Sequence, residues 1–330
     1  MNKNKHAIEY LRSEKKQTTV NEKIDAVIMF VDLNDIEWRN RYDEYVKTHE
    51  IPIPEINNVE VRSRDYGTLK CLIRSIEKNI PWINNVFLVV QSESQVPKWI
   101  NRETVKVVLH EDFIPKEFLP LYNTFTIQTH LHLIPGLSEK FLCISDDSII
   151  TQPMYPMDFF LKDKIVQCIV INDKNYIKNS SSKHSHLFKV GASEHTKKIC
   201  GVKNDYYYQD DHSIQPMLKS VNNYVYNKIE NIHEYFSAFR EVGNVFKYTF
   251  LTFTKLTRKC IMVPSRSRGV SFHYMDMNKF RKWVKVNQGR KQISVNDQDL
   301  NPLFDKELFY KMVEETLYQL FPNKSQKYEL

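Results

Sequence analysis

The feature of this sequence that most constrains its fold is a series of short apolar, β-branched runs. The first, Ile24–Val31, is almost wholly apolar, which is typical of a strand buried on both faces in a parallel sheet. Val86–Val90, Val105–Leu109 and Phe141–Ile144 predict further strands, and Gly67–Asn79 has apolar residues at helical spacing. This order of strands and helix indicates an α/β fold with a mainly parallel sheet flanked by helices.

The second half of the chain is predicted to be mostly helical. Ile214–Ile229 has apolar residues at mixed spacing, and a clearer helical stripe follows a candidate cap at Asp305. The stripe consists of Leu308, Met312, Val313, Leu317 and Leu320. Residues 1–22 are polar and rich in lysine, so we expect a flexible lead-in. Residues 23–330 are predicted to form a single domain, with the sheet in residues 23–172 and the helical half in residues 173–330.

Composition limits the compartment and the ligands. No apolar run approaches the ~18–20 residues of a bilayer span, and Met1–Lys16 is charged where a signal peptide needs an apolar middle, so we expect a cytoplasmic protein. The cysteines include no Cys-x-x-Cys pair, which argues against a zinc knuckle. The formal charge of +7 suits phosphate ligands, nucleic acid or an anionic membrane face equally well.

Acidic residues follow two of the predicted strands. Asp32, Asn34 and Asp35 come directly after the first run, and Asp146-Asp147 comes just after the fourth. Because ligands in open α/β sheets bind outside the carboxyl ends of the strands, these groups predict one shared site. Adjacent carboxylates could hold a magnesium ion beside a diphosphate, although helix capping or solvation would also explain an Asp-Asp pair.

Histidines offer a second kind of candidate. His212 follows two aspartates and precedes a predicted helix, where it could serve as acid, base or phosphate ligand, or simply cap a loop. His130 and His132 do not share a helix face, so at most one of them points into a site.

Arginines and one amide-acid pair complete the candidates. Arg62, Arg64 and Arg240 could bind phosphate through their planar forks, although most arginines are solvated surface residues. The pair Asn296-Asp297 follows a short alternating run and is equally compatible with a turn.

Four segments resemble, in order, the conserved regions of the Stealth family of sugar-phosphate transferases. They are IDAVIMFVDLND (Ile24–Asp35); Arg62–Phe160, which includes RSRDYGTLKCLIRSIEKNIPWINNVFLVV and ISDDSIITQPMYPMDFF; DHSIQPMLKS with FREVGNVFKY; and RKQISVNDQD with FPNKSQKYEL. Leu33 replaces a usual glycine, Gln128 a frequent glutamate and Ser145 an asparagine, whereas Asp146-Asp147 is intact.

The resemblance implies a nucleotide-sugar-transferase-like fold and transfer of a sugar 1-phosphate. The donor would be a UDP-sugar, the acceptor a glycan or lipid-linked glycan, and the product a phosphodiester in capsular polysaccharide or exopolysaccharide. It implies Mg²⁺ or Mn²⁺ at Asp146 and Asp147, and no added modules. The implied catalytic residues are Asp146, Asp147, His212, Arg62 and Arg240, and the implied substrate-binding residues are Asp32, Asn34, Asp35, Asp65, Asn123, His130, Asn296 and Asp297.

Two alternatives stay open at this point. A metal-dependent glycosyltransferase would share the fold and the acidic ligands but attack the sugar's anomeric carbon. A nucleic-acid-binding protein is suggested by charge alone and would need a basic stripe with exposed aromatics. We expect no nucleic acid partner, whereas peripheral association with the inner face of a membrane is compatible with the basic charge.

Overall fold

The computed structural model describes most of the chain. The described residues are 22–50, 65–167, 169–173, 190, 194, 196–198, 200–203, 206–210, 214–241, 243–245, 247–263, 267–271, 277–296 and 306–330. Within these ranges no helix is long and apolar enough to cross a bilayer.

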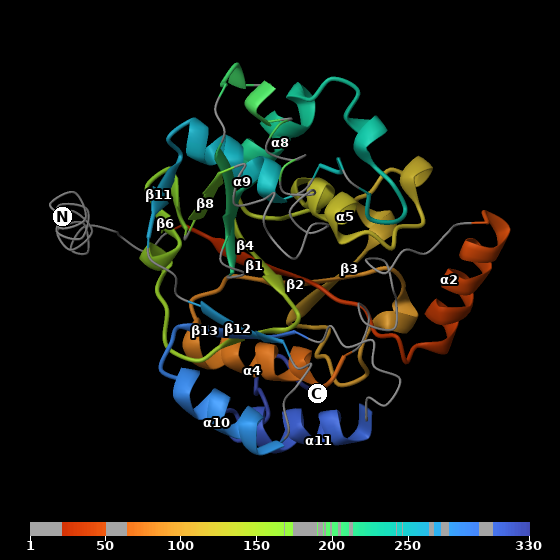
Figure 1. Ribbon diagram of the computed structural model, residues 1–330. Helices are drawn as coiled ribbons and strands as arrows, with labels where there is room; N and C mark the ends of the chain where they lie inside the picture. Colours follow the sequence, from red (N-terminus) through yellow and green to blue (C-terminus); the bar gives the residue numbers. More distant parts are fainter. Residues whose placement is uncertain are drawn as a thin grey trace, which may run out of the picture.

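A five-stranded sheet forms the centre of the molecule (Figure 1). Its strands, in spatial order, are β10 (Gln215–Leu218), β4 (Lys140–Ser145), β1 (Ile24–Met29), β2 (Val86–Val90) and β3 (Val105–Leu109). Four of them are parallel, and β10 pairs antiparallel with β4. The predicted α/β fold with a mainly parallel sheet is therefore confirmed.

Helices cover both faces of this sheet (Figure 1). One layer contains α4 (Thr68–Asn79), α10 (Met277–Asn287) and α11 (Lys306–Leu317), and the other contains α5 (Thr124–His130), α8 (Lys219–Lys228) and α9 (Lys247–Leu256). Alternate strand residues supply the two cores. Ala26 and Ile28 pack in the first, whereas Val27 packs in the second, as the twofold period of a strand requires.

Shorter elements surround the main sheet. The remaining strands are β5 (Ser148–Ile150), β6 (Phe160–Leu161), β7 (Lys164–Gln167), β8 (Ile169–Asp173), β9 (Tyr206–Asp210), β11 (Cys260–Met262), β12 (Ser267–Ser271) and β13 (Gln292–Asn296). The α-helix α2 (Ile36–Thr48) stands at one side of the molecule (Figure 1). Short 3-10 turns are η2 (Glu93–Gln95), η3 (His110–Asp112), η4 (Lys116–Phe118), η5 (Leu131–Leu133), η6 (Pro156–Asp158) and η7 (Ile232–Tyr235).

The second half contains more strand than its helical pattern predicts. The mixed spacing of Ile214–Ile229 arises because this segment is a strand, β10, followed directly by a helix, α8. In addition, β13 pairs with both β5 and β12. The strands β10 and β13 are only four and five residues long, too short for a twofold period to stand out against neighbouring helices.

The connections create a switch point at the middle of the sheet. From β1 the chain continues to β2 and β3 on one side, and then crosses back to β4 on the other side of β1. Parallel sheets with this reversal leave a crevice outside the carboxyl ends of the two strands at the switch, here β1 and β4. The fold therefore offers a binding site where the sequence places its acidic residues.

Candidate active site

Carboxylates from three segments gather near the switch point. Asp32 lies three residues beyond β1, and Asp146 and Asp147 form the turn between β4 and β5. Met29 pairs with Ser145, so the two strands end at the same level. Asp65, just before α4, is close enough to both groups to influence their charge. We call Asp32, Asp65, Asp146 and Asp147 the acid cluster.

The members of the acid cluster disfavour one another's ionisation. Desolvation, followed by the charges of Asp147 and Asp65, raises the pKa of Asp146 well above its usual range. Burial and the charge of Asp32 raise the pKa of Asp65 to about 6. Burial also raises the pKa of Asp32. Such a cluster favours bound protons or a cation, and a carboxyl with a raised pKa can accept a proton near neutral pH.

The position of Asp65 depends on a glycine. Its Oδ1 accepts hydrogen bonds from the Gly67 amide at 2.9 Å and from Thr68 Oγ1 at 3.3 Å. Gly67 adopts a φ of +78°, which is costly for other residues. A Cβ atom at this position would also lie 2.6 Å from the Tyr318 hydroxyl. The glycine in the Asp-Tyr-Gly sequence before α4 is therefore required by the backbone conformation and by the close approach of Tyr318.

Asp35 and Asn34 support the acid cluster from the start of α2. Asp35 is the N-cap of α2, and its Oδ1 accepts from the amides of Glu37 and Trp38 at 3.0 and 3.3 Å. Burial acts to raise its pKa, but hydrogen bonds, including one from Gln95, outweigh that effect and lower it. Asn34 donates from both its amide and its side chain to Asp32 Oδ1, at 2.8 and 2.9 Å.

Two further side chains at the site were missed by the sequence analysis. Gln95 donates to Asp35 Oδ2 at 2.6 Å and holds the backbone of Asp32. Tyr310 of α11 donates to the carbonyl of Asp65, and Asn34 donates to its hydroxyl at 3.2 Å. Gln95 follows the end of β2, so the rule that ligands bind outside the carboxyl ends of parallel strands could have pointed to it. Tyr310 has no local signal, because it meets Asp65 across 245 residues.

Arg240 is held at the start of α5. Its Nη2 donates to Thr124 Oγ1 at 2.7 Å, and its guanidinium lies over the Phe125 ring, 4.9 Å from the centroid. Asn123, the N-cap of α5, is fully buried. Its Nδ2 contacts the carbonyls of residues 237 and 239 and Oδ1 of Asn244, at 3.0 to 3.1 Å. Asn123 therefore holds the loop that carries Arg240 rather than lining an open pocket.

His130 lies within the core. It is fully buried, its Nδ1 lies 2.8 Å from the carbonyl of Thr126, and its ring packs against Phe118, Tyr226 and Phe236. Burial lowers its pKa to about 4, so the imidazole is neutral at physiological pH. This position favours packing over the predicted contact with substrate.

Several predicted site residues lie outside the described part of the structure. These are Arg62, Arg64, His212 and Asp297, and only the backbone of Asn296 is described. The described neighbours of two of them contact the acid cluster or the strand that leads to it. The Val295 amide, at the end of β13, donates to the carbonyl of Asp147 at 3.0 Å. Gln215, three residues after His212, pairs with Cys143 near the carboxyl end of β4.

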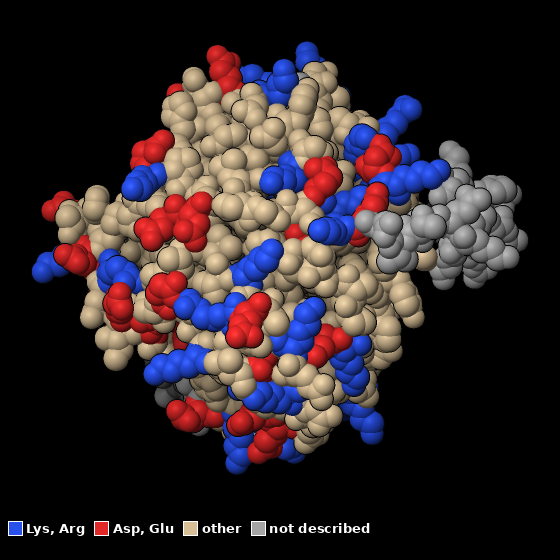
Figure 2. All heavy atoms as spheres, turned by 180° about the vertical axis from the view of Figure 1, so that it is seen from behind, with Lys and Arg blue, Asp and Glu red and all other residues tan. Residues whose placement is uncertain are grey.

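Two structural observations bear on metal ions and nucleic acids. Among the described residues, no three His, Cys, Asp or Glu side chains converge to hold a metal ion. The acid cluster could therefore supply part of a coordination shell, with ligand oxygens and water completing it. On the face shown in Figure 2, basic and acidic side chains are interspersed rather than gathered into the basic stripe that nucleic acid binding favours.

Comparison with known proteins gives one family match and several relatives. Residues 62–169 match the sequence model of Stealth protein CR2, conserved region 2. The receptor polysaccharide phosphotransferase WefC of Streptococcus gordonii is 29% identical over 342 residues, which cover 92% of this chain and 98% of WefC. The capsular polysaccharide phosphotransferase CpsJ of Streptococcus thermophilus is 38% identical over 143 residues, which cover 43% of this chain and 59% of CpsJ. Among solved structures, the bifunctional glycosyltransferase WbbM matches with a TM-score of 0.42 and 12% identity, over 92% of this chain and 52% of WbbM. This similarity is too distant to transfer a function.

Proposed function

Because this chain carries conserved region 2 of the Stealth proteins, we propose that it is a sugar-1-phosphate transferase of cell-surface polysaccharide synthesis. The donor is a nucleotide sugar of the UDP type, carrying a hexose or N-acetylhexosamine. The acceptor is a hydroxyl group of a glycan or lipid-linked glycan, met at the cytoplasmic face of the membrane. The observation that carries the proposal is the acid cluster at the switch point between β1 and β4.

The proposed reaction exchanges one phosphorus–oxygen bond for another. The acceptor hydroxyl attacks the phosphorus attached to the sugar and loses its proton to a base. The bond from that phosphorus to the nucleoside monophosphate breaks, and the electron pair leaves with the monophosphate. The anomeric bond of the sugar is untouched, so the product is a phosphodiester. The protein's part is to orient the two substrates, balance charge and hold the proton.

The acid cluster fits a hard divalent cation in its donor chemistry, since all its candidate ligand atoms are carboxylate oxygens, and the pKa values of Asp146 and Asp65 are raised. We assign Mg²⁺ or Mn²⁺ to Asp146 and Asp147, where it would neutralise charge on the donor diphosphate. Asp32 and Asp65 would line the donor beside it. Arg62 and Arg240 would contact phosphate oxygens, and His212 would act as base or phosphate contact.

The nucleotide released tests this proposal. Purified protein is incubated with a panel of UDP-sugars, a divalent cation and a neutral glycan, and the nucleotide product is identified by chromatography. Release of UMP together with a phosphodiester product is expected. Release of UDP would instead mean attack at the anomeric carbon and an ordinary glycosyltransferase. An Asp146→Asn variant controls for contaminating hydrolases, because it should release neither nucleotide at the wild-type rate.

A further inference from the structure

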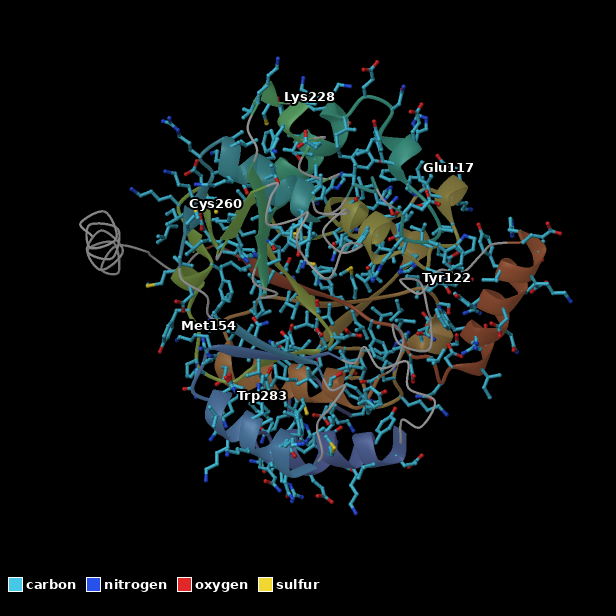
Figure 3. All side chains as sticks on the ribbon, viewed as in Figure 1. Glu117, Tyr122, Met154, Lys228, Cys260 and Trp283 are labelled. Atoms are coloured by element: carbon cyan, nitrogen blue, oxygen red, sulfur yellow. The ribbon has the colours of Figure 1, made fainter. Side chains whose placement is uncertain are left out.

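A cavity of about 410 Å³ lies beside α2, and no residue of the acid cluster lines it. Its walls come from α2, from the loop after β2, from η3 and from the segment that ends at Tyr122. Figure 3 shows Tyr122 next to α2. The volume of the cavity is in the usual range for sites that bind small molecules, about 300–1,000 Å³. We call it the α2 cavity, and none of its lining residues is among those implied by the family resemblance.

The α2 cavity shares two elements with the acid cluster. Gln91 and Ser92 line the cavity, and four residues beyond Gln91 the same loop reaches Gln95, which holds Asp32 and Asp35. Asp35 begins α2, and Arg41 of the cavity wall is six residues further along, or about 9 Å at 1.5 Å per residue. A ligand in the cavity would therefore lie beside a substrate bound at the acid cluster.

The cavity combines flat aromatic walls with unused polar groups. Tyr45 and Tyr122 lie with their ring centroids 5.8 Å apart, and Tyr45 stacks on His49 at 4.1 Å. Gln91 Oε1 and His110 Nδ1 are buried and have no hydrogen-bond partner within the described residues. A buried polar atom without a partner lowers stability, and a ligand with hydroxyl groups could supply the missing hydrogen bonds after a small side-chain movement.

Charge argues against a phosphate in this cavity. Glu44 and Glu111 contribute carboxylates to the lining. The guanidinium of Arg41 is already engaged, because it donates to Glu37 Oε1 and Ser92 Oγ at 2.5 Å each. Burial lowers the pKa of His110 to about 3, so that imidazole brings no positive charge at neutral pH. The cavity therefore suits a neutral ligand that offers both an apolar face and several hydroxyl groups.

We propose that the α2 cavity binds a neutral sugar unit of the acceptor glycan and holds it beside the acid cluster. Pyranose rings present an apolar face of C–H groups to aromatic side chains and hydroxyls to amide and imidazole groups. The inference rests on the proposed function only in naming the sugar as part of the acceptor, because binding in the cavity is measured without any reaction.

Nuclear magnetic resonance titrations of the full chain test the proposal directly. Lactose, N-acetyllactosamine and maltose serve as neutral probes, and UMP serves as the probe for the donor side. At least one disaccharide is expected to shift the ring resonances of His110 and Tyr122, whereas UMP leaves them in place. Shifts caused by UMP would assign the cavity to the donor nucleotide and overturn the proposal, as would the absence of a response to every disaccharide.

Substitutions then separate binding from folding. His110→Phe keeps an aromatic ring but removes the unpartnered nitrogen, so the melting temperature should not fall. The affinity for the disaccharide should nevertheless fall by roughly 10-fold or more. Tyr45→Ala should weaken binding in the same way, and Tyr155→Ala, at a tyrosine that is 57% exposed and outside the cavity, is the matched control. Unchanged affinity in His110→Phe and Tyr45→Ala would contradict the proposal. Failure of the wild-type chain to release any nucleotide would contradict the proposed function while leaving these titrations valid.

Discussion

Gln95 holds the backbone of Asp32 from both sides with a single carboxamide. The Asp32 amide donates to Gln95 Oε1 at 2.7 Å, and Gln95 Nε2 donates to the Asp32 carbonyl at 3.1 Å. The same nitrogen lies 2.6 Å from Asp35 Oδ2, so one side chain ties the end of β1 to the start of α2. Since Gln95 is only 2% exposed, these bonds are shielded from water and position Asp32 within the acid cluster.

Replacing Gln95 by leucine should therefore damage both stability and activity. The substitution leaves the Asp32 amide and carbonyl without their partner, so we expect a loss of about 1–3 kcal/mol in the free energy of unfolding. Sugar-phosphate transfer should fall as Asp32 moves. Urea denaturation and the nucleotide-release assay measure the two effects. Gln152→Leu, at a glutamine that bonds the Gln288 carbonyl, is the control and should keep its activity.

Asn123 should act on the reaction through Arg240. In Asn123→Ala the residues Ser237, Phe239 and Asn244 lose their bonds to the start of α5, so transfer activity should fall to a level similar to that of Arg240→Ala. Because both substitutions act through the position of Arg240, the transfer activity of the double variant should be no lower than that of the less active single variant. Losses that simply add would show that Asn123 is only structural. Asn287→Ala, at another buried asparagine, should lower stability without this coupling.

Asp146→Asn should separate catalysis from folding. Desolvation by burial and, after it, repulsion by Asp147 and Asp65 raise the pKa of Asp146, and the neutral amide removes both penalties, so the melting temperature should stay the same or rise. Turnover should nevertheless fall by roughly 10²-fold or more, since the carboxylate is proposed to hold the cation or the proton. Excess chelator should abolish wild-type activity, and added Mg²⁺ or Mn²⁺ should restore it. Full activity in chelator would overturn the metal assignment.

The raised pKa of Asp65 predicts a specific pH dependence of stability. Its folded pKa of about 6 exceeds the unfolded value of about 3.9, so the folded state binds this proton more tightly. The resulting stability is complete below the unfolded pKa and is lost as pH rises between about 4 and 6.

The buried histidines change stability with pH in the opposite direction to Asp65, so their effect must be separated from that of Asp65. Burial lowers the pKa values of His110 and His130 to about 3 and 4, so their contribution is present above about pH 6.5 and is lost as pH falls. Comparison of Asp65→Asn with the wild type cancels these histidines. In metal-free protein, urea denaturation across this range should show the variant gaining stability relative to the wild type as pH rises. A constant difference would contradict the shift.

His212 remains a prediction from the family-like segment that contains it. If it acts as base or phosphate contact, His212→Gln should lower turnover by roughly 10²-fold while the melting temperature is kept. Loss of a mere loop cap would instead cost about 1 kcal/mol of stability with little change in turnover. His233→Gln, at an exposed histidine in η7, provides the matched control.

The local pattern of the sequence determined the four parallel strands of the central sheet and one part of the site. Apolar runs mark β1 to β4 because buried parallel strands need continuous apolar residues, and α4 shows its helical period because one face enters the core. The aspartates that follow β1 and β4 could be placed at one edge because parallel strands end on the same side of a sheet.

Only the tertiary structure decided which side chains complete that edge. Gln95 reaches Asp32 across 63 residues, and Tyr310 reaches Asp65 across 245 residues. Asn123 was predicted to line a pocket and instead lies fully buried, joined to a loop more than 110 residues away. Periodicity reports which face of an element is apolar, whereas these contacts depend on how separate elements pack, and no local pattern encodes that packing.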